Sequence, residues 1–337
     1  MTLIDIVIPC YNEEEVILKF YEETKKVLDN IEDYKFQLIF IDDGSKDATL
    51  DNIKKLSKED EGVKYLSFSR NFGKEAGMYA GLKYSIGEYV IIMDADLQHP
   101  PELIPKMINE VENGYDCCAA RRIKRKGNEP IRNVFSNMYY KISNKLTNLE
   151  LVQGAVDYRI MSRQMVDEVL RLSEVQRFSK GIFEWVGFDT KWIPYEDVDR
   201  TMGKTKWSFW GLFKYGMGGI TAFSIVPLRL VSAMGFVISF FAFVYIIITL
   251  CKTLIFGIDV PGYVTLLSAV LFLGGITVLS IGIIGEYVGQ IYLEAKDRPI
   301  YILKQTNISS KEVLKVEKTS NKKEETHKEY GQEKSSN

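Results

Sequence analysis

Short hydrophobic runs recur along the first part of the chain and are separated by longer polar stretches. The runs are Ile4–Ile8, Phe36–Ile41, Val63–Phe68 and Tyr89–Met93. Polar segments of helix-like composition accompany them at Glu13–Asn30, Asp47–Glu59 and Glu102–Asn113. This alternation predicts an α/β domain built on a mostly parallel sheet. In such a sheet, ligands bind at the carboxyl ends of the strands.

Two later stretches contain no charged residue: 22 residues from Leu230 to Cys251 and 26 residues from Val260 to Gly285. About 20 apolar residues are enough to span a bilayer. Neither stretch has the polar stripe that a helix of a soluble bundle would show. We therefore expect two transmembrane helices, at about 230–251 and 260–285, in preference to a pair of buried core helices.

Basic residues flank the two expected spans, whereas the connector Lys252–Asp259 is short. The flanking residues are Lys204, Lys206, Lys214 and Arg229 before the first span and Lys296, Arg298 and Lys304 after the second. The positive-inside rule therefore predicts that both termini and the N-terminal domain are cytoplasmic. The first ten residues contain Asp5 and lack a basic segment, so they predict a strand and not a signal peptide.

These patterns divide the chain into four segments. Residues 1–205 form the expected cytoplasmic domain. Residues 206–228 are expected to form an amphipathic helix at the membrane interface, with an ordinary core helix as the alternative for Trp207–Phe223. Residues 229–304 hold the two membrane helices and a juxtamembrane helix. Residues 305–337 are rich in Lys, Glu, Ser and Asn, and they predict a disordered polar tail.

The composition narrows the range of partners. Lys plus Arg (43) nearly balance Asp plus Glu (45), which gives a net charge of -2, so nucleic acid is not an expected partner. The cysteines form no CxxC pair, which argues against a disulfide scaffold or a zinc module and favours a reducing compartment. They are Cys10, Cys117, Cys118 and Cys251.

Polar loops follow three of the expected strands, at Pro9–Glu14, Asp42–Ser45 and Asp94–Gln98. Each loop alone has a structural explanation, since Asn12 could cap a helix, Asp43-Gly44 could form a turn and Asp94 could bind backbone amides. Together the loops bring four carboxylates to one edge of the sheet, where like charges repel unless a cation or hydrogen-bond donors are present. Oxygen-only ligands favour Mg²⁺ or Mn²⁺ beside a diphosphate.

The strings IVIPCYNEE, IDDGSKDAT, RNFGKEAGMYAGL and MDADLQHPPE occur in this order ahead of the two apolar stretches. In this respect residues 3–300 resemble the family 2 glycosyltransferases with a GT-A fold. More narrowly, they resemble the polyprenyl-phosphate glycosyltransferases, the group that contains bactoprenol glucosyltransferases and dolichol-phosphate mannose synthase. The resemblance implies an α/β, Rossmann-like GT-A domain that binds a nucleotide sugar, followed by interfacial helices and a two-helix transmembrane hairpin.

The resemblance also implies roles for residues of the donor site. The nucleotide sugar would be bound by Pro9, Tyr11, Glu13, Asp42 and Asp94. Mg²⁺ or Mn²⁺ would be held by Asp94, Asp96 and Gln98, with Asp96 also counted as catalytic. Such a cation offsets the charge that develops on the diphosphate as the sugar–oxygen bond breaks. His99 is expected to be a loop residue near the site and not a ligand.

A basic stretch lies between the expected strands of the sheet and the membrane helices. It contains Arg121, Arg122, Lys124, Arg125, Lys126 and Arg132 against one acid, Glu129. A solvated surface is the alternative, but the planar guanidinium of Arg suits a phosphate. By resemblance, the lipid phosphate would be bound by Arg122, Arg132, Ser136, Arg200 and Lys206. The last two belong to a loop similar to the family's RxxGxSK motif, in which Thr205 replaces Ser.

Asp157 matches the position of the general base in this family, so it is counted as catalytic. The alternative is a loop carboxylate that pairs with Arg159. A phosphomonoester is already largely dianionic at pH 7. Asp157 would then orient the acceptor more than it abstracts a proton.

We therefore expect a metal-dependent, inverting glycosyltransferase of the bacterial cell membrane that serves cell-envelope glycosylation. It would move glucose or N-acetylglucosamine from a UDP-linked nucleotide sugar to undecaprenyl phosphate at the cytoplasmic leaflet. Expected partners are the nucleotide sugar, polyprenyl phosphate and the lipid bilayer, with a second copy of the chain and a flippase as further candidates. The alternatives are a processive polysaccharide synthase, whose QxxRW motif Ser173–Phe178 only approaches, and a non-catalytic membrane accessory protein that retains the fold.

Overall fold

A computed structural model describes residues 1–124, 140–147, 149–196, 218–256 and 262–309 of the chain. The chain divides into two compact units. The first unit comprises Met1–Tyr140, Glu150–Trp207 and Pro299–Asn337, and the second comprises Lys141–Leu149 and Ser208–Arg298. The first unit carries the sheet, and the second carries two long helices.

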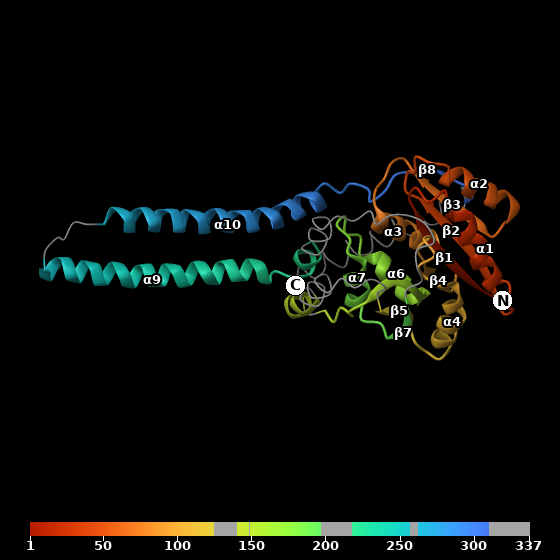
Figure 1. Ribbon diagram of the computed structural model, residues 1–337, viewed down its shortest axis with the longest axis horizontal. Helices are drawn as coiled ribbons and strands as arrows, with labels where there is room; N and C mark the ends of the chain where they lie inside the picture. The colour runs from red at the N-terminus through yellow and green to blue at the C-terminus, as the bar shows by residue number, and fades with distance from the viewer. Residues whose placement is uncertain (125–139, 148, 197–217, 257–261, 310–337) are drawn as a thin grey trace, which may run out of the picture. The chain divides into compact units, whose positions relative to one another are not determined.

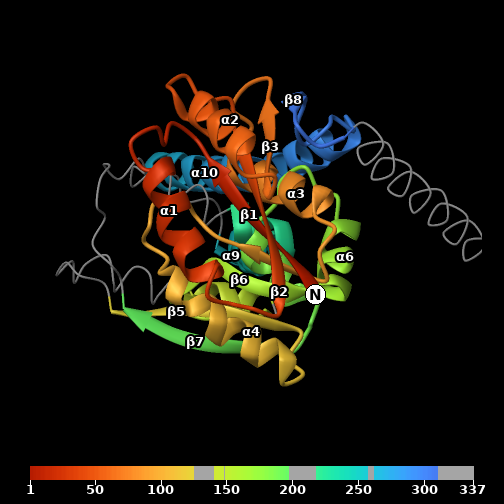
Figure 2. The same cartoon turned by 90° about the vertical axis from the view of Figure 1, so that its right-hand side faces the viewer.

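The first unit is built on an eight-stranded sheet with the order β7-β5-β6-β4-β1-β2-β3-β8 (Figures 1 and 2). The strands are β1 (Thr2–Cys10), β2 (Tyr34–Asp42), β3 (Val63–Phe68), β4 (Tyr89–Ile92), β5 (Cys117–Lys124), β6 (Ala155–Ser162), β7 (Thr190–Glu196) and β8 (Leu303–Thr306). Strand β1 runs parallel to β2 and β4, and β2 runs parallel to β3. The four strands expected from the hydrophobic runs are therefore confirmed as a parallel set.

The remaining strands make the sheet mixed. Strand β6 is antiparallel to both β4 and β5, and β8 is antiparallel to β3, whereas β5 and β7 are parallel. The hydrophobic runs gave no separate signal for these four strands. Central strands are buried on both faces because helices cover the sheet on each side, which is why β1 contains an uninterrupted buried segment from Ile4 to Ile8.

One face of the sheet is covered by α1 (Ile17–Leu28), α2 (Thr49–Glu59) and the pair η1 (Pro101–Leu103) and α4 (Ile104–Glu112). Phe20, Ile53 and Met107 from these helices pack in one cluster with Ile6 and Phe40 of the strands. All five side chains have no exposed surface. Their removal from water is the main favourable contribution to this core.

The other face is covered by α3 (Lys74–Tyr84), with α6 (Arg163–Arg171) and α7 (Ser179–Trp185) beyond it. Two glycines let α3 approach the strands closely. A Cβ atom added at Gly81 would lie 2.2 Å from Val7 Cγ1, and one at Gly77 would lie 3.4 Å from Pro9 Cβ. The string GKEAGMYAG thus fixes the distance between α3 and β1, and with it the position of the first residue of the helix.

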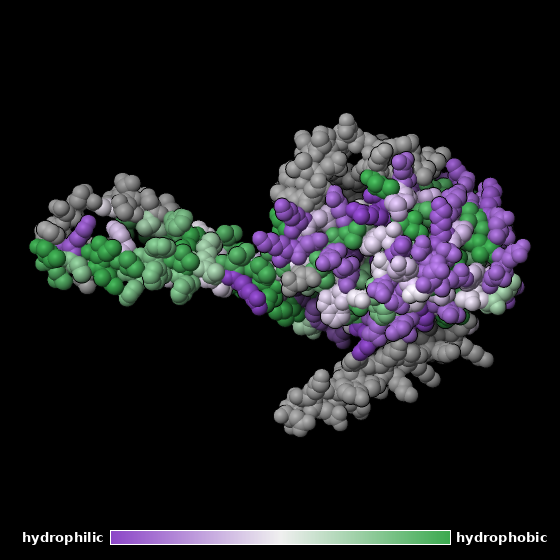
Figure 3. All heavy atoms as spheres, turned by 90° about the horizontal axis from the view of Figure 1, so that it is seen from below, coloured by the Kyte–Doolittle hydropathy of each residue, from purple (hydrophilic) through white to green (hydrophobic). Residues whose placement is uncertain are grey.

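The second unit contains α9 (Val226–Phe256) and α10 (Tyr263–Ala295), which run antiparallel (Figure 1). Segments Val226–Tyr245 and Phe272–Ala295 are long and apolar enough to cross a membrane. Figure 3 shows hydrophobic residues along the surface of this pair. Helix α9 extends beyond the expected span 230–251 at both ends, whereas α10 begins three residues inside the expected span 260–285 and extends beyond its end. The helices continue through charged residues such as Arg229 and Glu286, at which an uncharged stretch ends.

A short helical segment precedes α9 within the expected interfacial helix. Residues 218–223 are helical, whereas residues 206–217 of that prediction lie outside the described part of the chain. Tyr287 donates from its hydroxyl to the carbonyl of Ser224 at 2.6 Å, and Gln290 Nε2 donates to Thr221 Oγ1 at 2.6 Å. These bonds join the segment before α9 to α10.

The expected disordered tail from residue 305 is wrong at its beginning. Strand β8 pairs with the edge of β3, and Asn307 accepts from the amide of Tyr65 at 2.8 Å and donates to the carbonyl of Val63 at 3.0 Å. Tyr301 stacks on Phe68 with ring centroids 5.0 Å apart. A polar strand at a sheet edge is stabilised by backbone hydrogen bonds, which hydropathy does not detect. The rest of the tail, residues 310–337, lies outside the described residues.

Candidate active site

The loops that follow β1 and β2 are joined by hydrogen bonds at the carboxyl edge of the sheet. The amide of Asn12 donates to Ser45 Oγ at 3.0 Å, and the amide of Lys46 donates to Asn12 Oδ1 at 2.9 Å. The amide of Glu13 donates to Thr49 Oγ1 at 2.8 Å. Asn12 has a left-handed backbone with φ of 54°, and it lies well before the start of α1 at Ile17. Its side chain therefore connects two loops and does not cap that helix.

The two adjacent aspartates after β2 have different hydrogen-bond partners. Asp42 is 1% exposed, and its carboxylate accepts from the amide of Ser45 at 3.0 Å and from the hydroxyl of Ser67 at 2.8 Å. Asp43 accepts from the amides of Phe72 and Gly73 at 2.6 and 2.9 Å. Burial raises the pKa of Asp43 in spite of these two amide bonds. Asp43 thus fixes the loop that leads into α3.

The loop after β4 folds around His99. The amide of Asp94 donates to His99 Nδ1 at 3.3 Å, and the amide of Gln98 donates to Asp96 Oδ1 at 3.1 Å. His99 is 3% exposed and stacks on Tyr158 with ring centroids 5.1 Å apart. Burial lowers the pKa of His99, which agrees with a neutral ring that accepts a hydrogen bond. His99 therefore shapes the loop from inside.

Lys74, the first residue of α3, joins two carboxylates that come from different strands. Its Nζ lies 2.7 Å from Asp94 Oδ1, 2.8 Å from Asp94 Oδ2 and 2.6 Å from Asp157 Oδ2. Burial alone would lower the pKa of Lys74, but the charges of Asp157 and Asp94 outweigh it and raise that pKa above its usual range. The structure thus brings Asp94 and Asp157 together on one ammonium group.

Sequence reasoning missed Lys74. The residue stands inside RNFGKEAGMYAGL, one of the strings that carried the family resemblance, but a single lysine at a helix start has no chemical signature of its own. The one indication in the sequence is the position of Lys74 directly after Gly73. The φ of Gly73 is 97°, and the chain turns there into α3. A cation that enters the sheet edge from the helix side is a natural partner for the carboxylates after the strands.

Asp157 lies near the start of β6 and is surrounded by cations. Its side chain is 15% exposed. Burial raises its pKa, but the charges of Lys74 and Lys180 together hold the pKa of Asp157 well below its usual range. Arg159 instead donates to the carbonyl of Val156 at 3.2 Å and lies 4.0 Å over the ring of Phe183. Asp157 therefore forms its ion pair with Lys74. The alternative, in which Asp157 pairs with Arg159, is not what the structure shows.

The other predicted site residues fall into two groups. Pro9, Tyr11 and Glu13 are half-buried beside the loops described above, and Arg122 lies in β5, where its amide donates to the carbonyl of Gly154 at 2.9 Å. Gly154 has φ of 81° and turns the chain into β6. Arg132, Ser136, Arg200 and Lys206 lie outside the described residues.

The donor set near Asp94 suits a hard cation. Asp94 and Asp96 offer carboxylate oxygens, Gln98 offers an amide oxygen, and the Nδ1 of His99 is already occupied by the amide of Asp94. Within the described ranges, no group of three or more His, Cys, Asp and Glu side chains forms a metal cluster. Mg²⁺ is typically bound by one or two carboxylates together with waters and substrate phosphates. The residues present therefore fit a cation that is completed by a bound diphosphate.

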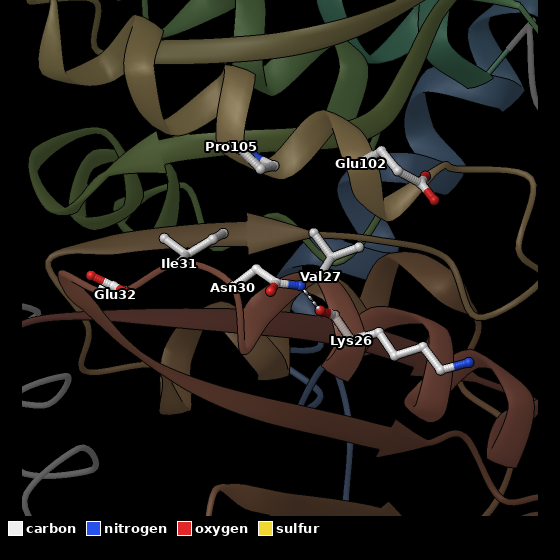
Figure 4. A pocket seen from close by; sticks show the side chains of 7 residues that line it. All are labelled: Lys26, Val27, Asn30, Ile31, Glu32, Glu102 and Pro105. Carbon is white, nitrogen blue, oxygen red and sulfur yellow. Dashed lines mark hydrogen bonds between the residues drawn. The ribbon is translucent and has the colours of Figure 1, made fainter.

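A separate pocket lies between α1 and the η1–α4 segment, away from these carboxylates. Figure 4 shows the residues of α1 and its following turn on one side and Glu102 and Pro105 on the other. The lining residues are Lys26, Val27, Asn30, Ile31, Glu32, Glu102 and Pro105. None of them is a predicted site residue, so we do not assign the nucleotide to this pocket.

Comparisons with known proteins agree over nearly the whole chain. Residues 5–170 match the family Glycosyl transferase family 2, and residues 226–291 match the GtrB C-terminal hairpin. CsbB of Bacillus subtilis (strain 168), whose name describes a glycosyltransferase, is 50% identical over 92% of this chain and 94% of its own length. Bactoprenol glucosyl transferase of Shigella phage SfII is 40% identical over 90% of this chain and 98% of its own length.

Among solved structures, glucosyl-3-phosphoglycerate synthase from Mycobacterium tuberculosis matches with a TM-score of 0.45. The identity is 17%, over 65% of this chain and 78% of that chain.

Proposed function

The chain belongs to glycosyltransferase family 2, and from this premise we propose that it transfers a hexose from a nucleotide sugar to polyprenyl phosphate at the cytoplasmic leaflet. The observation that carries the proposal is the full-length similarity to bactoprenol glucosyl transferases, which includes the C-terminal hairpin. The sugar would be glucose or N-acetylglucosamine, the donor a UDP-sugar and the acceptor undecaprenyl phosphate. Two membrane helices would hold the active site close to the lipid.

The donor would bind at the loops after β1, β2 and β4, of which the first two are joined by hydrogen bonds. Tyr11, Glu13 and Pro9 are half-buried there and are available to line a base and ribose site. Asp42 is held by Ser45 and Ser67, so we assign it to shaping the nucleotide loop through the Ser45 amide. Asp94 is 27% exposed and would face the diphosphate.

Asp94, Asp96 and Gln98 would hold Mg²⁺ or Mn²⁺. When bound, the cation supplies positive charge that stabilises the departing diphosphate. The chain's own residues would orient the reactants. Asp157 is ionised and paired with Lys74, so it would position the acceptor. Most of the acceptor phosphate is already dianionic at pH 7, so Asp157 would seldom need to act as a base.

The acceptor phosphate would be bound from the other side of the reacting carbon by Arg122, Arg132, Ser136, Arg200 and Lys206. A phosphate oxygen forms the new bond to the anomeric carbon, and the bond to the nucleoside diphosphate breaks with its electron pair on the diphosphate. Attack opposite the leaving group inverts the anomeric configuration. Arg122 is favoured for this role because a guanidinium can donate two parallel hydrogen bonds to a phosphate.

The test is an assay of membranes that contain the protein, with undecaprenyl phosphate and a panel of labelled UDP-glucose, UDP-N-acetylglucosamine, UDP-galactose and GDP-mannose. We expect one monosaccharide on the lipid, formed with one donor and abolished by Asp96→Asn. A long polymer would indicate a processive synthase. Absence of transfer and of donor hydrolysis with all four donors would contradict the proposal and favour an accessory protein.

A further inference from the structure

We propose that Lys74 occupies the cation position at Asp94 in the donor-free enzyme and competes there with the divalent cation, so that the metal binds productively only together with the nucleotide. The inference rests on the proposed function, in which Asp94 holds the metal. It makes Lys74 a positioning residue that sets the order of binding. The contacts of Lys74 with two carboxylates are the observation that leads to it.

The geometry is that of an occupied cation site. The Nζ atom of Lys74 contacts both oxygens of Asp94, at 2.7 and 2.8 Å, and one oxygen of Asp157, at 2.6 Å. A divalent cation on the oxygens of Asp94 would lie within a few ångströms of this ammonium group. Like charges at such a distance repel each other, and water screens them only in part because Asp94 and Asp157 are 27% and 15% exposed. Lys74 and a free metal ion therefore exclude each other at Asp94.

The backbone of Lys74 is fixed from three directions. Asp43 binds the amides of Phe72 and Gly73, directly before the lysine. Gly81 allows close contact between α3 and β1. Glu75, directly after the lysine, accepts from both the amide and the hydroxyl of Ser179. Because its backbone is fixed in this way, the start of α3 directs the Lys74 side chain towards the two carboxylates.

A nucleotide diphosphate changes the balance of charge. Lys74 contacts two carboxylates and supplies one positive charge for their two negative charges, and the charge of Lys180 also acts on Asp157. A diphosphate adds at least two more negative charges, so the site can then accept both the ammonium group and a divalent cation. Lys74 can keep its contact with Asp157 while Asp94 turns to the metal. The lysine would thus keep free metal out and let the metal–nucleotide pair in.

The test measures binding of Mn²⁺ alone to the full-length protein in detergent, by the electron paramagnetic resonance signal of free Mn²⁺. We expect Lys74→Met to bind Mn²⁺ at least tenfold more tightly than the unaltered protein, and Lys74→Gln to do the same, whereas Lys74→Arg keeps the charge and binds as before. Lys83→Met removes the same charge from the far end of α3 and should leave the affinity unchanged. With saturating UDP the difference should shrink to less than threefold.

Two outcomes overturn the inference: Mn²⁺ affinity that is unchanged or weaker in both neutral Lys74 variants, or an equal gain in Lys83→Met. An Asp94→Asn variant separates this failure from that of the proposed metal site. If Mn²⁺ binds Asp94→Asn as well as the unaltered protein, the assignment of Asp94 as a ligand is wrong, and the Lys74 inference is wrong with it. If Asp94→Asn loses Mn²⁺ and the neutral Lys74 variants gain nothing, only the role of Lys74 is wrong.

Discussion

Three aspartates outside the carboxylate pair on Lys74 are held by donors of their own. Asp5 accepts from the amides of Ile86 and Gly87 at 2.5 and 2.7 Å. Asp43 accepts from two amides before α3, and Asp60 accepts from the Tyr21 hydroxyl at 2.8 Å and the Gly62 amide at 2.7 Å. A buried carboxylate is tolerated when hydrogen bonds replace those it made with water. These residues therefore stabilise loops and are not candidates for chemistry.

Asp60 allows a test of this structural role through pH. Burial raises its pKa, but the Tyr21 hydroxyl, the Gly62 amide and Lys25 outweigh burial and lower the pKa of Asp60 below its usual range. Because the folded state favours the ionised form, its stabilisation is complete above the unfolded pKa and is lost as pH falls through the folded one. We expect Asp60→Asn to reduce the free energy of unfolding by about 1–2 kcal/mol at pH 7.

Thermal unfolding in detergent at several pH values measures this effect. The difference between the variant and the unaltered protein should narrow as pH falls below about 4. Glu22→Gln, an exposed change on α1, is the matched control and should stay within about 0.5 kcal/mol at every pH. A difference for Asp60→Asn that does not vary with pH would contradict the role of its charge.

Arg122 is the described residue with which the proposed acceptor site can be tested. Arg122→Ala removes a charge-assisted hydrogen bond to phosphate, worth about 1.5–3 kcal/mol, or roughly ten- to a hundredfold in apparent lipid affinity or turnover. Affinity for UDP-sugar, measured by calorimetry, should change little. Arg121→Ala, the neighbouring change at an exposed position whose side chain donates to the carbonyl of Gln153, should leave lipid dependence unaltered. Loss of donor affinity with normal lipid dependence would place Arg122 on the donor.

The site shows at residue scale what sequence could predict and what it could not. The motif after β4 predicted that Asp94 and Asp96 follow a strand end, and this placement is confirmed. The ion pair of Asp94 and Asp157 with Lys74 depends on how α3 packs against the sheet. A pattern of residue types carries no information on which cation reaches which carboxylate, because that is decided by tertiary distances.

At the scale of elements, periodicity worked where a strand or helix has its own hydrophobic signal. Strand β1 is apolar along its buried length, and α1 buries Ile17 and Phe20 on one face. Helix α3 instead buries residues on every side, including Gly77 and Gly81, so it lacks an amphipathic pattern. Strand β8 is held by backbone pairing to an exposed edge. The positions of α3 and β8 therefore depend on the elements that pack or pair with them, and not on a hydrophobic pattern of their own.

Asn307 provides a test of how β8 is held. Its side chain binds the amide of Tyr65 at 2.8 Å and the carbonyl of Val63 at 3.0 Å, so it extends the pairing by one residue. We expect Asn307→Ala to cost about 1–2 kcal/mol locally, which is roughly five- to thirtyfold faster exchange of the Tyr65 amide hydrogen. Asn307→Asp keeps the acceptor and should have a smaller effect.

Hydrogen exchange measured by mass spectrometry on the full chain checks this result. The amide of Ile39, in the interior strand β2, is the internal control and should keep its protection. Equal acceleration of Tyr65 and Ile39 would mean that Asn307 affects global stability and not the β8 edge.

At the scale of the whole molecule, the α/β fold of the GT-A type followed by two apolar helices was predictable and is confirmed. Four apolar runs defined the parallel strands, and two uncharged stretches defined α9 and α10. Four further strands were not predicted, because β5, β6 and β7 have only short apolar stretches interrupted by charged residues and β8 is polar. Hydropathy alone therefore predicts that an α/β domain precedes two apolar helices, but it does not predict the outer strands of the sheet.

The last prediction concerns how the chain crosses the membrane. Helices α9 and α10 contain 31 and 33 residues. At about 1.5 Å per residue they are longer than a hydrocarbon core of about 30 Å, so their ends would reach the headgroups on both sides. Lys252 lies one turn before the end of α9 and Ser309 lies after β8. With cytoplasmic termini, Lys252 would lie at the outer surface and Ser309 inside the cell.

Single cysteines at these two positions test the arrangement in intact cells, in a Cys251→Ser background. Cys10, Cys117 and Cys118 are buried, so they should contribute little background labelling. We expect a membrane-impermeant maleimide to label Lys252→Cys directly and Ser309→Cys only after the membrane is permeabilised. The reverse pattern would place the α/β unit outside the cell. Because nucleotide sugars are made in the cytoplasm, that result would also remove the donor from the proposed reaction.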